Sequence, residues 1–147
     1  HQQVLSDFVQ DMEELLKENH GVLIYASSTQ AMLGMEADSY DTGGLYYPIE
    51  NFCPDVRPAS FANGIRPESL TIDDPAGQPY DTVKTVLTQL TSLGTDKNFL
   101  PMLQADTDPA SALEYTALQM EEQIRALEEC GITGYILYSE QGSYPFS

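Results

Sequence analysis

Apolar residues recur along this chain in two alternating patterns, one typical of helices and the other of short strands. Spacings of three and four residues predict amphipathic helices over residues 3–19 and 83–93, and between residues 113 and 127. Short apolar runs, rich in β-branched and aromatic residues, lie between them. These runs predict strands near residues 22–27, 51–56, 98–104 and 132–139.

Local signals mark where the helices start and stop. Asp108 followed by Pro109 is typical of an N-cap and a first helical residue, so we expect a helix to begin there. Gly131 supplies a left-handed cap at the other end of the same helix. Asp81 is expected to cap the preceding helix, and a short helix is expected over residues 30–37.

Strands that alternate with helices predict an α/β domain with a parallel sheet. Units of this kind suit either half of a (β/α)8 TIM-type barrel or a small doubly wound α/β domain. A complete barrel takes about 250 residues, and this chain has 147. We therefore expect residues 1–147 to form a single domain or a half-barrel fragment.

The charge balance excludes some partners. The chain has 23 acidic and 6 basic residues, a formal net charge of −17, which repels nucleic-acid phosphates and anionic lipid headgroups. We expect no nucleic-acid partner and, because no run approaches the ~20 apolar residues of a membrane helix, no membrane insertion. The start at His1, within a helical pattern, suggests a piece of a longer protein. Cys53 and Cys130 are expected to be free thiols.

Acidic side chains follow several of the predicted strands. Because the carboxyl ends of parallel strands open on one rim, Asp55, Asp106 and Glu140 are expected to lie there. Glycoside hydrolysis needs a pair of carboxyl groups, one protonated and one ionised. Each of these acids also has a structural interpretation, as a loop or helix-cap carboxylate. The residues expected to contact a sugar by stacking or hydrogen bonding are Tyr25, Arg57, Gln104, Tyr135 and Tyr138.

Other hydrolytic machinery is missing from the sequence. The chain has no G-x-S-x-G elbow, no P-loop and no G-x-G-x-x-G after a strand, and only two histidines. Asp106 and Asp108 have a spacing found in calcium loops, but the glycine turn and distal glutamate of such a loop are absent. We expect no metal and no cofactor.

Segments along nearly the whole chain resemble, in order, a bacterial family of glycoside hydrolase-like proteins known as domain of unknown function 4015. They read DFVQDMEELLKENHGVLIYAS, FCPDVRPASF, PYDTVKTVL, FLPMLQAD and EEQIRALEECGITGYILYSEQGSY. The resemblance implies a TIM-type barrel related to α-amylase-like glycosidases, with this chain as its C-terminal half. It also implies carbohydrate as the partner and a location outside the cell or at the cell envelope.

We consider three hypotheses for this chain. The first is a glycoside hydrolase-like domain whose catalytic carboxylates come from Asp106, Glu140 and Asp55. The second is a non-catalytic carbohydrate-binding or structural domain derived from the same barrel, which Ser27 favours because the family tends to carry an acid there. The third is a complete small α/β module of flavodoxin-like shape.

A half-barrel has a structural consequence of its own. It would leave two sheet edges and an apolar inner face uncovered, with Ile24, Met102 and Ile136 on that face. We expect such a chain to associate with another copy or with a missing N-terminal half.

Overall fold

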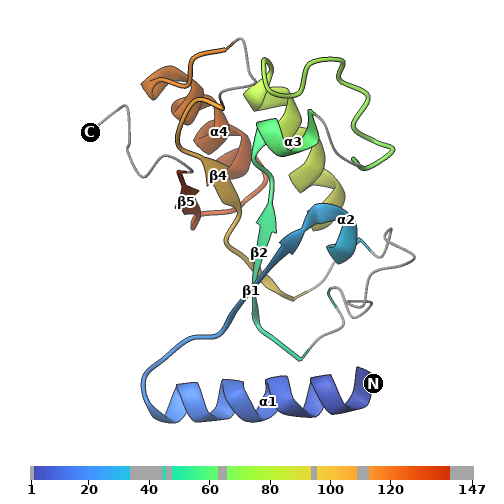
Figure 1. Cartoon of the computed structure of the whole chain (residues 1–147), viewed down its shortest axis with the longest axis vertical. Helices are drawn as coiled ribbons and strands as arrows, with labels where there is room; N and C mark the ends of the chain where they lie inside the picture. The colour runs from blue at the N-terminus through green and yellow to red at the C-terminus, as the bar shows by residue number, and fades with distance from the viewer. Residues whose placement is uncertain are drawn as a thin grey trace.

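The computed structural model describes residues 2–33, 45, 48–62, 66–93, 96–108 and 113–139, except for the side chains of Gln2 and Leu5 (Figure 1). Its parallel strands are β1 (Ile24–Ser28), β2 (Asn51–Asp55), β4 (Met102–Gln104) and β5 (Ile136–Tyr138). They lie in the order β1-β2-β4-β5. This order follows the sequence without the reversal of a doubly wound sheet, so the expected α/β fold of parallel βα units is confirmed. The sheet is open, as part of a barrel would be.

The strand expected over residues 98–104 consists of two short segments, β3 (Asn98–Phe99) and β4. Both pair with β2 in one register, because Asn98 lies opposite Asn51 and Met102 lies opposite Asp55. Pro101 lies between the segments and has no N–H to donate to the ladder. Its carbonyl still accepts the N–H of Ile136 at 2.9 Å. The pairing with β5 therefore includes Pro101, although no strand is assigned to it.

The expected last strand, residues 132–139, is also shorter in the structure. The N–H of Ile132 donates to the carbonyl of Leu127 at 3.1 Å, and the N–H of Gly131 to that of Glu128 at 2.9 Å. Together with the positive φ of Gly131, 77°, these bonds close the preceding helix. Ile132 therefore belongs to the helix cap, and the strand begins only at Ile136.

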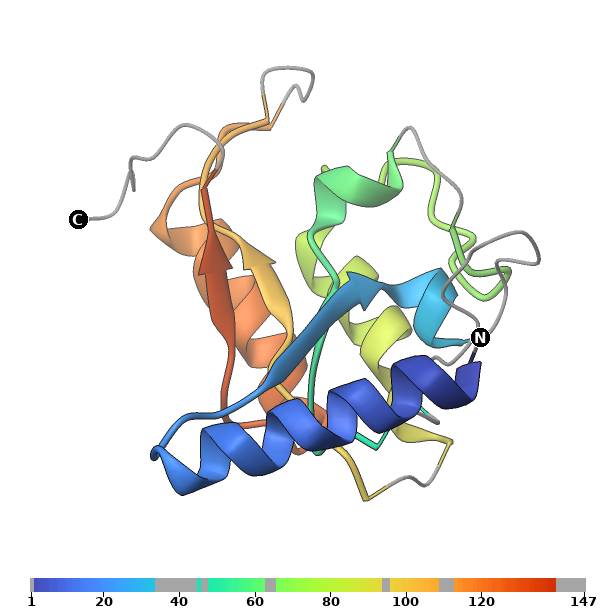
Figure 2. The same cartoon turned by 60° about the horizontal axis from the view of Figure 1, so that its bottom comes forward.

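Two helices cover one face of the sheet, α3 (Pro79–Thr91) and α4 (Ala117–Glu129), which lie side by side (Figures 1 and 2). Between them and the strands lies a core of buried side chains. From the strands it includes Phe52 and Leu103, and from the helices Val83, Val86, Leu87, Leu90, Ala126 and Leu127. No described helix is long and apolar enough to cross a membrane.

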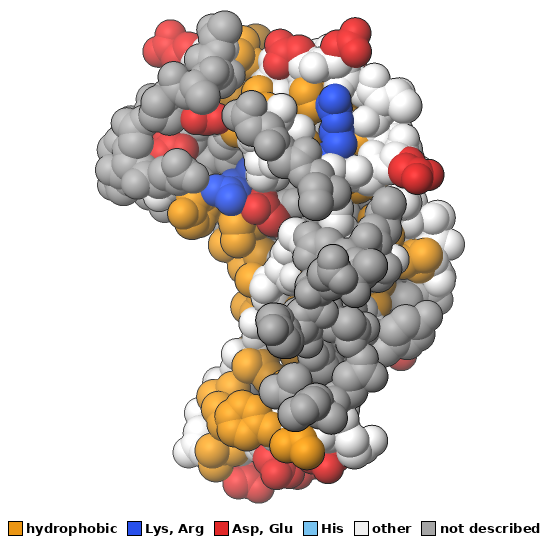
Figure 3. Space-filling view, turned by 45° about the vertical axis from the view of Figure 1, so that its right-hand side comes forward, with side chains coloured by type: hydrophobic (Ala, Val, Ile, Leu, Met, Phe, Trp, Pro, Cys, Tyr) orange, Lys and Arg blue, Asp and Glu red, His pale blue; other side chains and the backbone are white. Residues whose placement is uncertain are grey.

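The opposite face of the sheet is left uncovered by α3 and α4. Alternate strand residues point to opposite faces, so the register places Ile24, Met102 and Ile136 away from Phe52 and Leu103. Ile24 is 39% exposed, and the other two are half-buried. The space-filling view shows a hollowed outline with hydrophobic side chains along the hollow (Figure 3). An uncovered apolar face is what an incomplete barrel would present.

Helix α1 (Gln2–Glu18) lies below the amino ends of the strands (Figure 1). Val9 packs against the core, as expected of a helix buried on one side. Yet Val4, Phe8 and Leu15 are 73%, 61% and 53% exposed. Strand β1, which follows α1, is at the edge of the sheet. Within the described residues, no further βα unit lies next to α1 to cover these side chains.

Several helix starts differ from those expected. Helix α4 begins after Thr116, whose N–H donates to Oε1 of Gln119 at 2.9 Å, so neither Asp108 nor Pro109 starts it. A capping arrangement closer to the helix prevails over the earlier Asp-Pro pair. Asp81 lies within the first turn of α3, which begins at Pro79. The short helix α2 (Thr29–Met32) is capped by Ser28, and residues 34–37 of its expected range lie outside the described residues.

Candidate functional site

A cavity of about 100 Å³ opens at the carboxyl ends of β2, β4 and β5. Its walls come from the strand exits and from the 3-10 helix η2 (Pro58–Phe61) that follows β2. The lining residues are Arg57, Ala59, Ser60, Gln104, Asp106, Asp108 and Tyr138. This is the rim where acids were expected from the sequence, and where barrel folds place their active sites.

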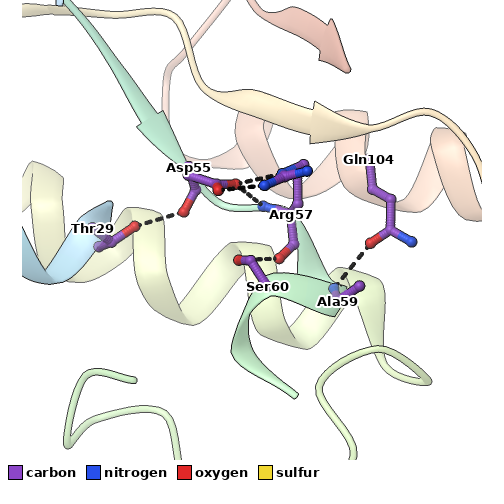
Figure 4. Close-up of polar contacts among 6 residues, drawn as sticks. All are labelled: Thr29, Asp55, Arg57, Ala59, Ser60 and Gln104. Carbon is purple, nitrogen blue, oxygen red and sulfur yellow. Dashed lines mark hydrogen bonds and ion pairs between the residues drawn. The ribbon is translucent and has the colours of Figure 1, made fainter. Parts of the chain in front are cut away.

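Asp55 and Arg57 form an ion pair beside this cavity (Figure 4). Oδ1 of Asp55 accepts the Nε of Arg57 at 2.9 Å and the backbone N–H of Arg57 at 3.1 Å. Oδ2 accepts Nη2, also at 2.9 Å. Both oxygens of Asp55 are therefore engaged in holding Arg57, and Asp55 itself does not line the cavity.

The guanidinium group of Arg57 lies over the ring of Tyr138, with its central carbon 4.3 Å from the ring centroid. This cation–π contact occupies one face of the tyrosine. The Asp55 carboxylate balances the charge of the guanidinium, and Arg57 and Tyr138 both line the cavity. Tyr138 remains 40% exposed.

Asp106 brings a carboxylate to the same cavity. Asp106 is only 7% exposed. Its Oδ2 accepts a hydrogen bond from the hydroxyl of Ser139 at 2.8 Å. A hydroxyl that donates to a carboxyl oxygen fixes the orientation of the carboxyl group. Ser139 directly follows β5, so the contact joins the exits of two neighbouring strands.

Gln104 links the two walls of the cavity. Its Oε1 accepts the N–H of Ala59 at 2.9 Å (Figure 4), and its Nε2 donates to the carbonyl of Asp106 at 3.0 Å. The residue is 3% exposed. One buried amide therefore connects η2 with the exit of β4.

Cys53 lies in β2 on the same face of the sheet as Asp55 and is 1% exposed. Burial, with a smaller contribution from the negative charge of Asp55, raises the pKa of the Cys53 thiol from 9.0 to about 11. A thiol of this kind is unreactive at neutral pH. Cys53 and the half-buried Cys130 are both free, as expected.

The structure brings together most of the expected site residues, namely Asp55, Arg57, Gln104, Asp106 and Tyr138. Tyr25 instead packs edge-on against Phe52 on the helix-covered face, with ring centroids 5.5 Å apart. Tyr135 lies before β5, at its amino end, and is 40% exposed. Glu140 lies outside the described residues.

Ser139, Ser60 and Asp108 also belong to the site but were not predicted from the sequence. Ser139 is the last residue of the strand expected over residues 132–139, and Asp108 comes four residues after the end of the strand expected over residues 98–104. Their closeness to predicted strand ends could have marked them. Within the described residues, no group of three or more His, Cys, Asp or Glu side chains is arranged to hold a metal ion.

Comparison with known proteins identifies the family. The family model DUF4015, described as "Putative glycosyl hydrolase domain", matches residues 1–144. Searches of curated proteins and of solved structures give no significant match. The match spans nearly the whole chain and agrees with the parallel βα architecture described above. This chain is therefore a member of the DUF4015 glycosyl hydrolase-like family.

Proposed function

We propose that this domain binds carbohydrate at the carboxyl rim of its sheet and cleaves a glycosidic bond there, with Asp106 as a catalytic carboxylate. The observation that carries the proposal is the Asp106 carboxylate, which lines the cavity and is oriented by Ser139. The family description supports the same class of reaction.

Glycoside hydrolysis divides its work between two carboxyl groups. The Ser139 hydroxyl donates to Oδ2 of Asp106 and orients the carboxyl group, so we assign Asp106 as the carboxylate that attacks the anomeric carbon or deprotonates a water molecule. The proton for the leaving oxygen then comes from a second acid. Glu140 is our candidate, because it follows Tyr138 by two positions, as Asp106 follows Gln104.

Asp55 takes a different part in this scheme. Its two carboxylate oxygens bind Arg57, so we assign it to positioning Arg57 and not to the acid pair. Arg57 and Tyr138 then form the sugar-binding platform. The net charge of −17 disfavours acidic polysaccharides, and we expect neutral glycans to bind better than polyuronates or sulfated glycans.

A non-catalytic carbohydrate-binding domain is the second candidate. Ser27 favours it, since the resemblance implies an acid at this exit of β1. The engagement of Asp55 with Arg57 favours it as well, because it removes one expected acid from the catalytic set. Both candidates use the same cavity, and turnover separates them.

The test is Asp106→Asn assayed on a panel of neutral glycans by release of reducing ends. We expect at least ~100-fold lower turnover, because the substitution removes a group that acts in the transition state. The melting temperature should stay nearly unchanged, since the variant keeps the size and the acceptor of the side chain. Asp81→Asn, on the exposed first turn of α3, is the matched control. Equal turnover of Asp106→Asn and the unchanged protein would remove Asp106 from the catalytic pair, and no turnover by the unchanged protein would favour the binding domain.

A further inference from the structure

The sheet separates at its carboxyl end between β2 and β4. Backbone groups of alternate residues in β4 face different neighbours, since Met102 accepts the N–H of Val56 on the β2 side while Ala105 donates to Tyr138 on the β5 side. Gln104 is two residues after Met102, so its backbone also faces β2. Strand β2, however, has ended at Asp55 and turned into η2. The ladder thus lacks a strand beside Gln104.

A side chain from α4 takes the place of the missing strand. Oε1 of Gln123 accepts the N–H of Gln104, and Nε2 of Gln123 donates to the carbonyl of Gln104, each at 2.9 Å. Gln123 is fully buried, with 0% exposure. A buried amide that satisfies both backbone groups fixes this end of β4, because breaking either bond would leave a polar group without water.

The side chain of Gln104 also bridges the space between β4 and η2. It accepts from Ala59 in η2 and donates to the carbonyl of Asp106. An amide can do both because it carries an acceptor and a donor on one planar group. A carboxylate offers only acceptors, and a thioether offers neither bond at useful strength.

We propose that Gln104, held by Gln123, is a positioning residue that sets the Asp106 carboxylate against the η2 wall of the cavity. Its effect on turnover rests on the proposed hydrolase function. The clamp itself, defined as the side-chain bonds of Gln104 to Ala59 and Asp106, exists independently of that function. The two parts are therefore measured separately.

Two substitutions at Gln104 test the two bonds of the clamp separately. Gln104→Met keeps the length of the side chain and removes both bonds at every pH. Gln104→Glu keeps the bond from Ala59 at every pH, but the introduced carboxyl donates to the Asp106 carbonyl only while it is protonated. Burial and the facing carbonyl oxygen both penalise the ionised form, so the introduced carboxyl should have a pKa above the ~4.3 of free glutamate. Gln89→Met and Gln89→Glu on α3, away from the cavity, are the matched controls.

The first measurement is amide exchange and carbonyl chemical shift by NMR. We expect the protection of the Ala59 amide to fall about tenfold in Gln104→Met and to persist in Gln104→Glu. In Gln104→Glu the carbonyl carbon of Asp106 should also shift with pH as the introduced carboxyl ionises. Among the described residues, the charged and titratable groups that line the cavity beside this position are Arg57, Asp106, Asp108 and Tyr138. All remain in every variant, so the effect is read as a difference from the unchanged protein.

The second measurement is turnover of a neutral glycan. Gln104→Met should lose about 100-fold, because a displaced catalytic group costs that much even without direct contact. Gln104→Glu should be active below the pKa of the introduced carboxyl and lose activity as pH rises through it. If Gln104→Met does not fold, the pH profile of Gln104→Glu still tests the proposal, since all bonds are present in its protonated form.

The outcomes separate the two proposals. Unchanged exchange of the Ala59 amide in Gln104→Met would overturn the clamp. A loss of Ala59 protection with full turnover would overturn its positioning role. Absence of glycan turnover by the unchanged protein would refute the hydrolase function alone, and amide exchange would then decide the clamp.

Discussion

The ion pair of Asp55 and Arg57 offers a quantitative test of how the cavity is built. Replacing Asp55 with Ala removes the acceptor of Nε, Nη2 and the backbone N–H of Arg57. The guanidinium would keep its place over Tyr138 without the Asp55 carboxylate. If Asp55 serves to position Arg57, the two side chains must be strongly coupled in stability.

The expected coupling follows from the number of bonds and their exposure. Two of the three hydrogen bonds are between side chains, and bonds to charged groups contribute about 1.5–3 kcal/mol each when buried. Both side chains are 21% exposed, so solvent screening reduces this. We expect a coupling free energy of about 2 kcal/mol. Asp55→Ala alone should cost about 3 kcal/mol, since it also removes the bond to the backbone N–H.

The assay is a double-mutant cycle of Asp55→Ala and Arg57→Ala, measured by urea unfolding. The control cycle uses Lys84 and Glu129, a pair with a similar distance of 3.0 Å whose side chains are 34% and 41% exposed. Its coupling should be smaller and more sensitive to salt. Additive effects of Asp55→Ala and Arg57→Ala would refute the reasoning and return Asp55 to the candidate catalytic acids.

Three further outcomes are expected. Because burial and the charge of Asp55 raise the Cys53 pKa from 9.0 to about 11, Cys53 should hold about 100-fold less thiolate near neutral pH than an ordinary thiol. Alkylation followed by mass spectrometry should therefore modify Cys130 first, and equal rates would contradict this. Gly131→Ala should destabilise the protein by about 1 kcal/mol in urea unfolding, because φ is 77° at this residue; Gly131→Asn, which tolerates this region better, should cost less. The open sheet and the exposed face of α1 should make the isolated chain self-associate or bind a missing N-terminal half. Light scattering that shows a dilution-resistant monomer, with no binding of hydrophobic dye, would indicate an already complete domain.

Much of the fold was determined by the order of residues along the chain. The spacing of apolar side chains predicted α1, α3 and the parallel strands, because burial on one face imposes a period that neighbours in sequence record. Element ends were predicted less well. The Asp-Pro pair at residues 108–109 gives a valid local signal for a helix start, yet α4 begins at Ala117. The capping box of Thr116 and Gln119 marks the start of α4 instead.

For the candidate site too, the sequence predicted some features and not others. Polar residues at strand exits were visible in the sequence, so Asp106, Gln104 and Tyr138 were expected on one rim, and the structure places them around one cavity. The partners of these residues were not visible. Gln123 is a polar residue on a helix, and only the tertiary structure brings its buried amide to the backbone of Gln104.

The tertiary structure also changed the interpretation of two residues. Asp55 was expected to be a catalytic acid at the end of β2, but both oxygens of its carboxylate bind Arg57, two residues later. Tyr25 was expected to bind sugar, but the register of β1 on β2 places it beside Phe52, where it is partly buried and packs against the core. A sequence pattern fixes which residues stand at the end of a strand, because that depends on neighbours along the chain. Which partners they meet depends on strand register and on where the sheet separates, and both are set by contacts between residues distant in sequence.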